Sequence, residues 1–176
     1  MKTTSSIGII NRYHWLAFAL ALSSVFSCQA PRVLVSEEKI QESIWKLKEQ
    51  VLSSGMQLLG KPYQKAAKGP DRFDCSGLVQ FIFSGAGISI GPSSKQQSLS
   101  GKEITLKEAL PGDLIFFGKN DQINHVGVIT ANKEDAVFVL HSTSSKGVLH
   151  EDILKSDYWV RRMIRINRFE SYLPTK

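Results

Sequence analysis

The periodicity of the sequence changes near Leu114, and this change restricts the folds that the chain can adopt. Before this point, apolar residues recur at helical spacing; after it, short runs rich in β-branched and aromatic residues alternate with turn residues. Helices first and strands afterwards indicate an α+β fold, with N-terminal helices packed on an antiparallel sheet. The predicted strands are Leu114–Phe117, His125–Thr130, Ala136–His141 and Tyr158–Ile166.

Two helices are predicted before the strands. The first begins after Ser36, a good N-cap because two acidic residues follow it and face the positive end of the helix dipole. Its apolar stripe, which we interpret as core packing, ends at Gly60. The second helix is expected to begin at Cys75 or Ser76 and to run to about Ser84.

Residues 1–27 have the layout of a secretory signal peptide. Lys2 and Arg12 are the only charged residues before Cys28, and they precede an apolar run at 15–22 that is too short to span a bilayer stably. The small residue directly before Cys28 resembles a lipobox, in which the cysteine is lipidated and becomes the first mature residue. The alternative is an uncleaved anchor with an incidental cysteine.

The chain is therefore predicted to have three parts: a signal peptide over 1–27, the lipidated cysteine with a short tether over 28–36, and one domain over 37–176. A length of 176 residues suits one ordinary domain. An extended tether of this length reaches only ~30 Å, which keeps the domain close to the membrane that holds the lipid. We expect a monomer.

The chain is basic, with a formal net charge of +6 at pH 7. Removal of Lys2 and Arg12 with the signal peptide leaves +4, which suits an anionic surface such as a cell wall or lipid headgroups. Basic residues do not interleave with aromatic ones on one readable face, so we expect no nucleic-acid partner. We interpret the basic cluster near the end as a solvated strand face; it comprises Arg161, Arg162, Arg165 and Arg168.

The two cysteines of an exported protein could form a disulfide, but a lipidated Cys28 leaves Cys75 as a free thiol. Catalysis is the commonest reason for such a thiol. At a helix start, backbone N–H groups and a nearby imidazolium can lower the thiol pKa from ~8.5, and the same N–H groups can stabilise an oxyanion. The alternative is a buried, inert cysteine, against which the polar and small neighbours Asp74, Ser76 and Gly77 argue.

Two of the four histidines are candidates for a catalytic base. His14 lies in the predicted signal peptide, and His150 lies in a predicted turn where a solvated side chain is the simple explanation. His125 and His141 lie on predicted strands, so one could be the base while the other fixes its tautomer. A zinc site with Cys75 is the alternative, but zinc sites usually draw two ligands from close sequence spacing. We expect neither a metal nor a cofactor.

Several motifs follow one another in a familiar order: Leu59–Tyr63, Phe73–Val79, Leu110–Phe117, His125–Val128 and His141–Val148. On these motifs, the region from about Gln57 to Phe169 resembles the NlpC family of cell-wall cysteine peptidases, which share a rearranged papain-like fold. The resemblance implies that Cys75 is the nucleophile, His125 the base and His141 the orienting residue.

The resemblance also implies a substrate. Family members usually hydrolyse the bond between D-glutamate and a diamino acid in peptidoglycan stem peptides, through an acyl-enzyme. Tyr63 matches a tyrosine that lines the family's active site, and we expect Asp74 and Ser76 to contact substrate as well. Two other functions remain open: a catalytically idle wall-binding module that retains the fold, and an amidase or acyltransferase that uses the same residues.

The chain departs from the family at one loop. Ala66 and Ala67 stand where the family commonly has two glycines. If those glycines need a positive φ, the alanines are strained or the loop is rearranged. The residue after the lipidated cysteine is Gln29 rather than aspartate, which favours an outer membrane, with the domain facing the periplasm.

Overall fold

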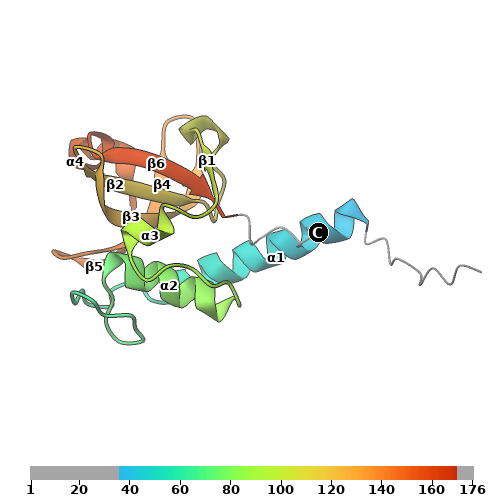
Figure 1. Cartoon of the computed structure of the whole chain (residues 1–176), viewed down its shortest axis with the longest axis horizontal. Helices are drawn as coiled ribbons and strands as arrows, with labels where there is room; N and C mark the ends of the chain where they lie inside the picture. The colour runs from blue at the N-terminus through green and yellow to red at the C-terminus, as the bar shows by residue number, and fades with distance from the viewer. Residues whose placement is uncertain (1–35, 170–176) are drawn as a thin grey trace, which may run out of the picture. The chain divides into compact units, whose positions relative to one another are not determined.

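The computed structural model describes residues 36–169 (Figure 1), so the predicted signal peptide and Cys28 lie outside the described residues. Helix α1 (Glu37–Met56) begins after Ser36, whose hydroxyl accepts a backbone N–H as the sequence predicts. Helix α2 (Cys75–Gly85) also begins where it is expected. Within the described part of the chain, no helix is long and apolar enough to cross a membrane.

The strands form one antiparallel six-stranded sheet in the order β1-β6-β2-β3-β4-β5. The α+β prediction is therefore confirmed. The strands are β1 (Lys102–Ile104), β2 (Leu114–Lys119), β3 (Gln122–Asn132), β4 (Val137–Thr143), β5 (Gly147–Asp152) and β6 (Met163–Arg168). Short helical segments join them: α3 (Ser94–Gln97), η1 (Leu106–Glu108), η2 (Ile153–Lys155) and α4 (Asp157–Val160).

Both faces of the sheet are covered by hydrophobic clusters, and alternate side chains of β2 belong to one cluster or the other. Leu114 and Phe116 belong to the hydrophobic cluster that includes the helices, whereas Ile115 and Phe117 belong to the cluster on the opposite face. A strand buried on both faces reads as a continuous apolar run, which is what this strand shows. Helix α1 packs on α2 and the sheet at Gly55, where a Cβ would overlap with the side chain of Leu140.

Two predictions about the C-terminal part are wrong. The predicted strand Tyr158–Ile166 is split, because residues 157–160 form α4 after Ser156 and only the later half enters the sheet as β6. The turn predicted around His150 is instead strand β5, which pairs with β4 along its whole length. The backbone N–H of Val148 also bonds the carbonyl of Lys61, so this strand is tied to the loop after α1.

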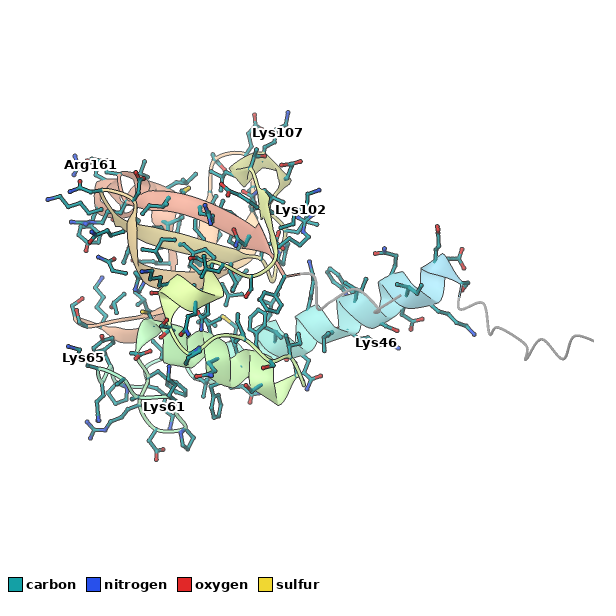
Figure 2. All side chains as sticks on the ribbon, viewed as in Figure 1. Lys46, Lys61, Lys65, Lys102, Lys107 and Arg161 are labelled. Carbon is teal, nitrogen blue, oxygen red and sulfur yellow. The ribbon has the colours of Figure 1, made fainter. Side chains whose placement is uncertain are left out.

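The basic cluster is not one solvated strand face. The guanidinium of Arg168 donates to the buried carboxylate of Asp113, with an Nη2–Oδ2 distance of 2.9 Å. Arg165 forms an ion pair with Glu103, 3.1 Å apart. The other two arginines follow α4 rather than lying in a strand. Figure 2 shows that basic side chains project from separate elements; those labelled are Lys46, Lys61, Lys65, Lys102, Lys107 and Arg161.

Candidate active site

The three predicted catalytic residues come from two layers of the fold. Cys75 is the first residue of α2, in the helical layer. His125 lies on β3 and His141 on the neighbouring β4, and both point to the sheet face opposite α2. Helix α2 contacts β3, and Figure 1 shows α2 on the same side of the sheet as α1. Cys75 and His125 both line one pocket, whose volume is about 280 Å³.

The thiol of Cys75 is surrounded by backbone groups. Its Sγ lies 3.9 Å from the carbonyl oxygen of Asn124. Burial raises the pKa of the Cys75 thiol, and the negative charge of Asp74 adds to this rise, while the backbone N–H groups of Ser76, Val126 and Cys75 itself act in the opposite direction. The predicted lowering of the thiol pKa is therefore wrong for this structure, because desolvation in the pocket wall outweighs the helix start.

The two histidines are hydrogen-bonded to each other. His125 Nε2 lies 3.0 Å from His141 Nδ1, which leaves His125 Nδ1 as the ring nitrogen available to the pocket. Burial lowers the pKa of His125 to about 3; the proximity of His141 acts in the same direction and Glu151 in the opposite one. Burial, followed by the charges of His150 and Lys146, lowers the pKa of His141 to about 4. Both imidazoles are therefore neutral near pH 7.

Two residues of this site were missed by sequence reasoning. Glu151 Oε1 lies 3.0 Å from His141 Nε2 and accepts a hydrogen bond from Trp159 Nε1 at 2.8 Å. Trp159 also packs against His125, with the ring centroids 4.9 Å apart. Both residues depend on elements that were not predicted, β5 and α4. In the observed register His141 pairs with Leu149, so Glu151, two residues further, lies on the same face as the imidazole.

The predicted substrate contacts divide into two groups. Tyr63 lines the pocket, and burial raises its pKa, with Cys75 and Asp74 adding to the rise. Asp74 instead caps α2, where its carboxylate accepts the Gly77 N–H at 2.5 Å. The hydroxyl of Ser76 is buried and lies 3.0 Å from the same carboxylate oxygen. The side chains of Asp74 and Ser76 thus hold the start of the helix together and lie outside the pocket lining.

The loop with the two alanines retains a left-handed residue. Ala66 has φ +62°, so the conformation that suits glycine is present although the residue is alanine. The carbonyl of Ala67 accepts the Asp74 N–H at 2.9 Å. A Cβ on Gly77 would overlap with that carbonyl, so Gly77 is required for the loop to pack on α2.

The pocket is polar and carries one formal charge at neutral pH. Among the described residues that line it, Arg162 is the charged one, and its guanidinium lies 4.3 Å from the ring centroid of Tyr158. Hydroxyl-bearing residues border it, namely Thr143, Ser144 and Ser145, whereas the hydroxyl of the lining residue Ser142 is buried and donates to the carbonyl of Phe73. Between residues 36 and 169 there is no group of three or more His, Cys, Asp or Glu side chains arranged to hold a metal ion.

Known proteins share this domain. The sequence model of the NlpC/P60 family matches residues 60–168. The chain is 34% identical over 126 residues to the bifunctional muramidase/DL-endopeptidase CwlT of Bacillus subtilis, covering 69% of this chain and 36% of that protein. It is also 34% identical over 117 residues to the γ-DL-glutamyl hydrolase of B. subtilis, covering 63% of this chain and 27% of that protein. This chain therefore matches about a third or less of each relative's length.

A solved structure shows the same fold. It is that of an NlpC/P60 family protein from Bacillus cereus, with a TM-score of 0.63 and 26% identity. The match covers 72% of this chain and 40% of that protein. This chain is therefore similar to the Bacillus cereus protein in the arrangement of its helices and strands as well as in sequence.

Proposed function

Because the chain belongs to the NlpC/P60 family, we propose that it is a cysteine endopeptidase that hydrolyses the bond between D-glutamate and a diamino acid in peptidoglycan stem peptides. The two relatives are named as a DL-endopeptidase and a γ-DL-glutamyl hydrolase, and these activities support this bond type. The observation that carries the proposal is the single pocket lined by Cys75 and His125, with His125 hydrogen-bonded to His141.

In the first step the thiol and the base begin neutral. As Cys75 Sγ attacks the scissile carbonyl carbon, its proton passes to His125 Nδ1 and the carbonyl electron pair moves onto oxygen. The backbone N–H groups at the start of α2 are placed to stabilise this oxyanion. Because the charges form only during attack, burial does not have to hold a thiolate–imidazolium pair in the resting enzyme.

In the second step the protonated His125 gives its proton to the leaving amine, and the C–N bond breaks to leave a thioester on Cys75. Water then attacks the thioester while His125 accepts its proton. Collapse of this intermediate breaks the C–S bond, His125 returns its proton to the thiol, and the new carboxylic acid loses its own proton to solvent to become a carboxylate. His141 holds the His125 ring in place through the Nε2–Nδ1 hydrogen bond of 3.0 Å.

The charge of the pocket supports an anionic peptide as substrate. A γ-linked D-glutamyl residue keeps a free α-carboxylate close to the bond that is cut. Arg162 offers a guanidinium within the pocket lining, and hydroxyl groups offer neutral donors. We therefore assign Arg162 to the recognition of a substrate carboxylate.

Muropeptide digestion tests the proposal. The purified chain should release fragments cut after D-glutamate, identified by mass spectrometry, whereas Cys75→Ser should lose nearly all hydrolysis and keep its circular dichroism spectrum. A chelator should leave the rate unchanged. Unchanged hydrolysis by Cys75→Ser would refute the nucleophile, intact stems cut from glycan would indicate an amidase, and stems bound but never cut would indicate an idle binding module.

We further propose that the chain is exported and anchored by lipid on Cys28, facing the periplasm from the outer membrane. The basic flank, short apolar run and small residue before Cys28 support this proposal, and Gln29 supports the outer membrane. The substrate proposed above is found outside the cytoplasm, which agrees with export.

A further inference from the structure

We propose that Glu151 is a positioning residue that fixes the direction of the hydrogen bonds through both imidazoles, and so keeps Nδ1 of His125 unprotonated and ready to accept the thiol proton. The inference rests on the proposed role of His125 as base. It goes beyond the Cys75–His125–His141 trio by assigning a function to a carboxylate on β5 that does not line the pocket.

The indole N–H of Trp159 can only donate a hydrogen bond. Its Nε1 lies 2.8 Å from Glu151 Oε1, so this oxygen acts as a hydrogen-bond acceptor. The same oxygen lies 3.0 Å from His141 Nε2. An acceptor pairs with a donor, so His141 Nε2 must carry a hydrogen. The ionised carboxylate has no hydrogen to donate, so it determines the polarity of the bond to His141, and the indole N–H bond agrees with this acceptor role.

The hydrogen on His141 Nε2 determines the rest of the chain. A neutral imidazole has one N–H, so His141 Nδ1 carries a lone pair. That nitrogen lies 3.0 Å from His125 Nε2, which must therefore donate and carry the hydrogen of the second ring. His125 Nδ1 is left with its lone pair free. This is the protonation state that a general base needs before it can take a proton from Cys75.

Without the carboxylate, the opposite direction would also be possible. Two imidazoles alone can bond with His141 Nδ1 donating to His125 Nε2, and then His125 Nδ1 carries the hydrogen and cannot accept another. A hydrogen bond to a charged group favours one direction by roughly 10–100-fold. Glu151 also acts after proton transfer, because its negative charge raises the pKa of His125 and so stabilises the imidazolium.

The geometry around Glu151 suits a fixed role. Its side chain is 29% exposed, whereas its partner His141 is fully buried, so the hydrogen bond reaches from the surface layer into the core. Two donors from different elements, β4 and α4, converge on one oxygen. These two hydrogen bonds hold the carboxylate in one orientation, and a carboxylate in a fixed orientation can favour one tautomer of His141.

The first test uses the unmodified protein with its histidines labelled with ¹⁵N. At neutral pH the ring nitrogen signals should show both His125 and His141 as Nε2–H tautomers. A wild-type His125 that carries its hydrogen on Nδ1 would overturn the proposal. This measurement needs no variant and no turnover, so its result is independent of whether the peptidase activity itself is found.

The second test compares Glu151→Leu and Glu151→Gln with Glu134→Leu, an exposed control in the β3–β4 turn. Glu151→Leu should populate the Nδ1–H tautomer of His125 and lower kcat ~10-fold or more, with KM changed little. Glu151→Gln keeps an acceptor oxygen and should retain the wild-type tautomer and most of kcat. Wild-type tautomers and kcat in Glu151→Leu would overturn the proposal; altered tautomers together with an active Cys75→Ser variant would overturn the proposed function alone.

Discussion

The indole of Trp159 stacks on the imidazole of His125, with ring centroids 4.9 Å apart and planes inclined by 22°. Trp159 also lies 4.9 Å from the ring of Phe117. The short helix α4 therefore supplies one wall of the pocket and shields one face of the His125 ring from water. This shielding contributes to the burial that lowers the pKa of His125.

Replacement of the Trp159 indole should change the pKa of His125 more than it changes the fold of the domain. Trp159→Ala exposes the imidazole and removes a donor to Glu151, so the pKa of His125 should rise toward 6.5 and kcat should fall ~10-fold or more. Titration of the His125 ring signals by NMR measures the shift. Trp45→Ala is the control, because Trp45 is 62% exposed on α1. An unchanged His125 titration in Trp159→Ala would show that the stacking does not shield the ring.

Stability should fall as the pH is lowered below about 6.5. His125 and His141 have folded pKa values of about 3 and about 4, below their ordinary 6.5, so in this window the unfolded chain binds protons that the folded chain does not. Each histidine then lowers the free energy of unfolding by ~1.4 kcal/mol per pH unit. Urea denaturation at pH 7, 6 and 5 measures this slope.

A variant isolates the histidine contribution from that of other titrating groups. His141→Gln removes one of the two buried imidazoles, so its stability should decline less steeply between pH 6.5 and 5 than that of the wild type. Equal slopes for the two proteins would contradict a neutral, buried His141.

Arg162 should govern substrate binding more than the chemical step. Arg162→Gln removes the cation from the pocket lining, and the loss of a charged hydrogen bond should raise KM ~10-fold while kcat changes less. Arg161→Gln is the matched control, because Arg161 is adjacent in the chain but outside this lining. Steady-state kinetics on a stem peptide give both constants. A larger effect for Arg161 than for Arg162 would argue against the carboxylate contact.

Substitution by glycine should have opposite effects on stability at the two alanines of the loop before α2. Ala66→Gly relieves a left-handed φ of +62° and should stabilise the fold by ~0.5–1 kcal/mol. Ala67 has no positive φ, so Ala67→Gly should destabilise by a similar ~0.5–1 kcal/mol through the entropy of the unfolded chain. Thermal denaturation of the two single variants decides this. The same sign for both would mean that Ala66 is not strained.

Lipid attachment can be tested separately from catalysis. Cys28→Ala should abolish labelling by a fatty acid supplied to cells and leave the hydrolytic activity of the domain unchanged, because Cys28 precedes the described domain. Fractionation should place the wild type in outer membranes. Equal labelling of wild type and variant would exclude Cys28 as the lipidation site.

The elements that could be predicted from the sequence are those whose caps and apolar patterns lie within the element itself. Helices α1 and α2 carry caps and apolar stripes of their own, and the central strands β2–β4 are apolar enough to be read directly. Strand β1 is short and polar, and β5 mixes charged with apolar residues, so their pairing depends on neighbours distant in sequence. Helix α4 was read as strand because its aromatic residues have high β propensity.

The same distinction applies to the site. Cys75, His125 and His141 stand in motifs that identify them one by one, and the structure brings them to one region. Glu151 could be placed beside His141 only through the register between β4 and β5, and Trp159 only after α4 was known. The direction of the pKa shift of the Cys75 thiol depends on its burial in the folded domain. Burial depends on packing between distant segments, so it cannot be read from a short stretch of sequence.

Burial of Cys75 beside a neutral imidazole has a consequence for selectivity. A thiolate that exists permanently would react with any electrophile that reaches it, whereas burial raises the pKa of the Cys75 thiol. In the mechanism proposed above, this thiol becomes nucleophilic only when a substrate carbonyl is aligned with it and His125 accepts its proton. Simple alkylating reagents should therefore modify Cys75 slowly at neutral pH. Under this mechanism only a molecule whose shape places its carbonyl carbon next to the sulfur would react with Cys75, so the fit of the substrate in the pocket controls the reactivity of the thiol.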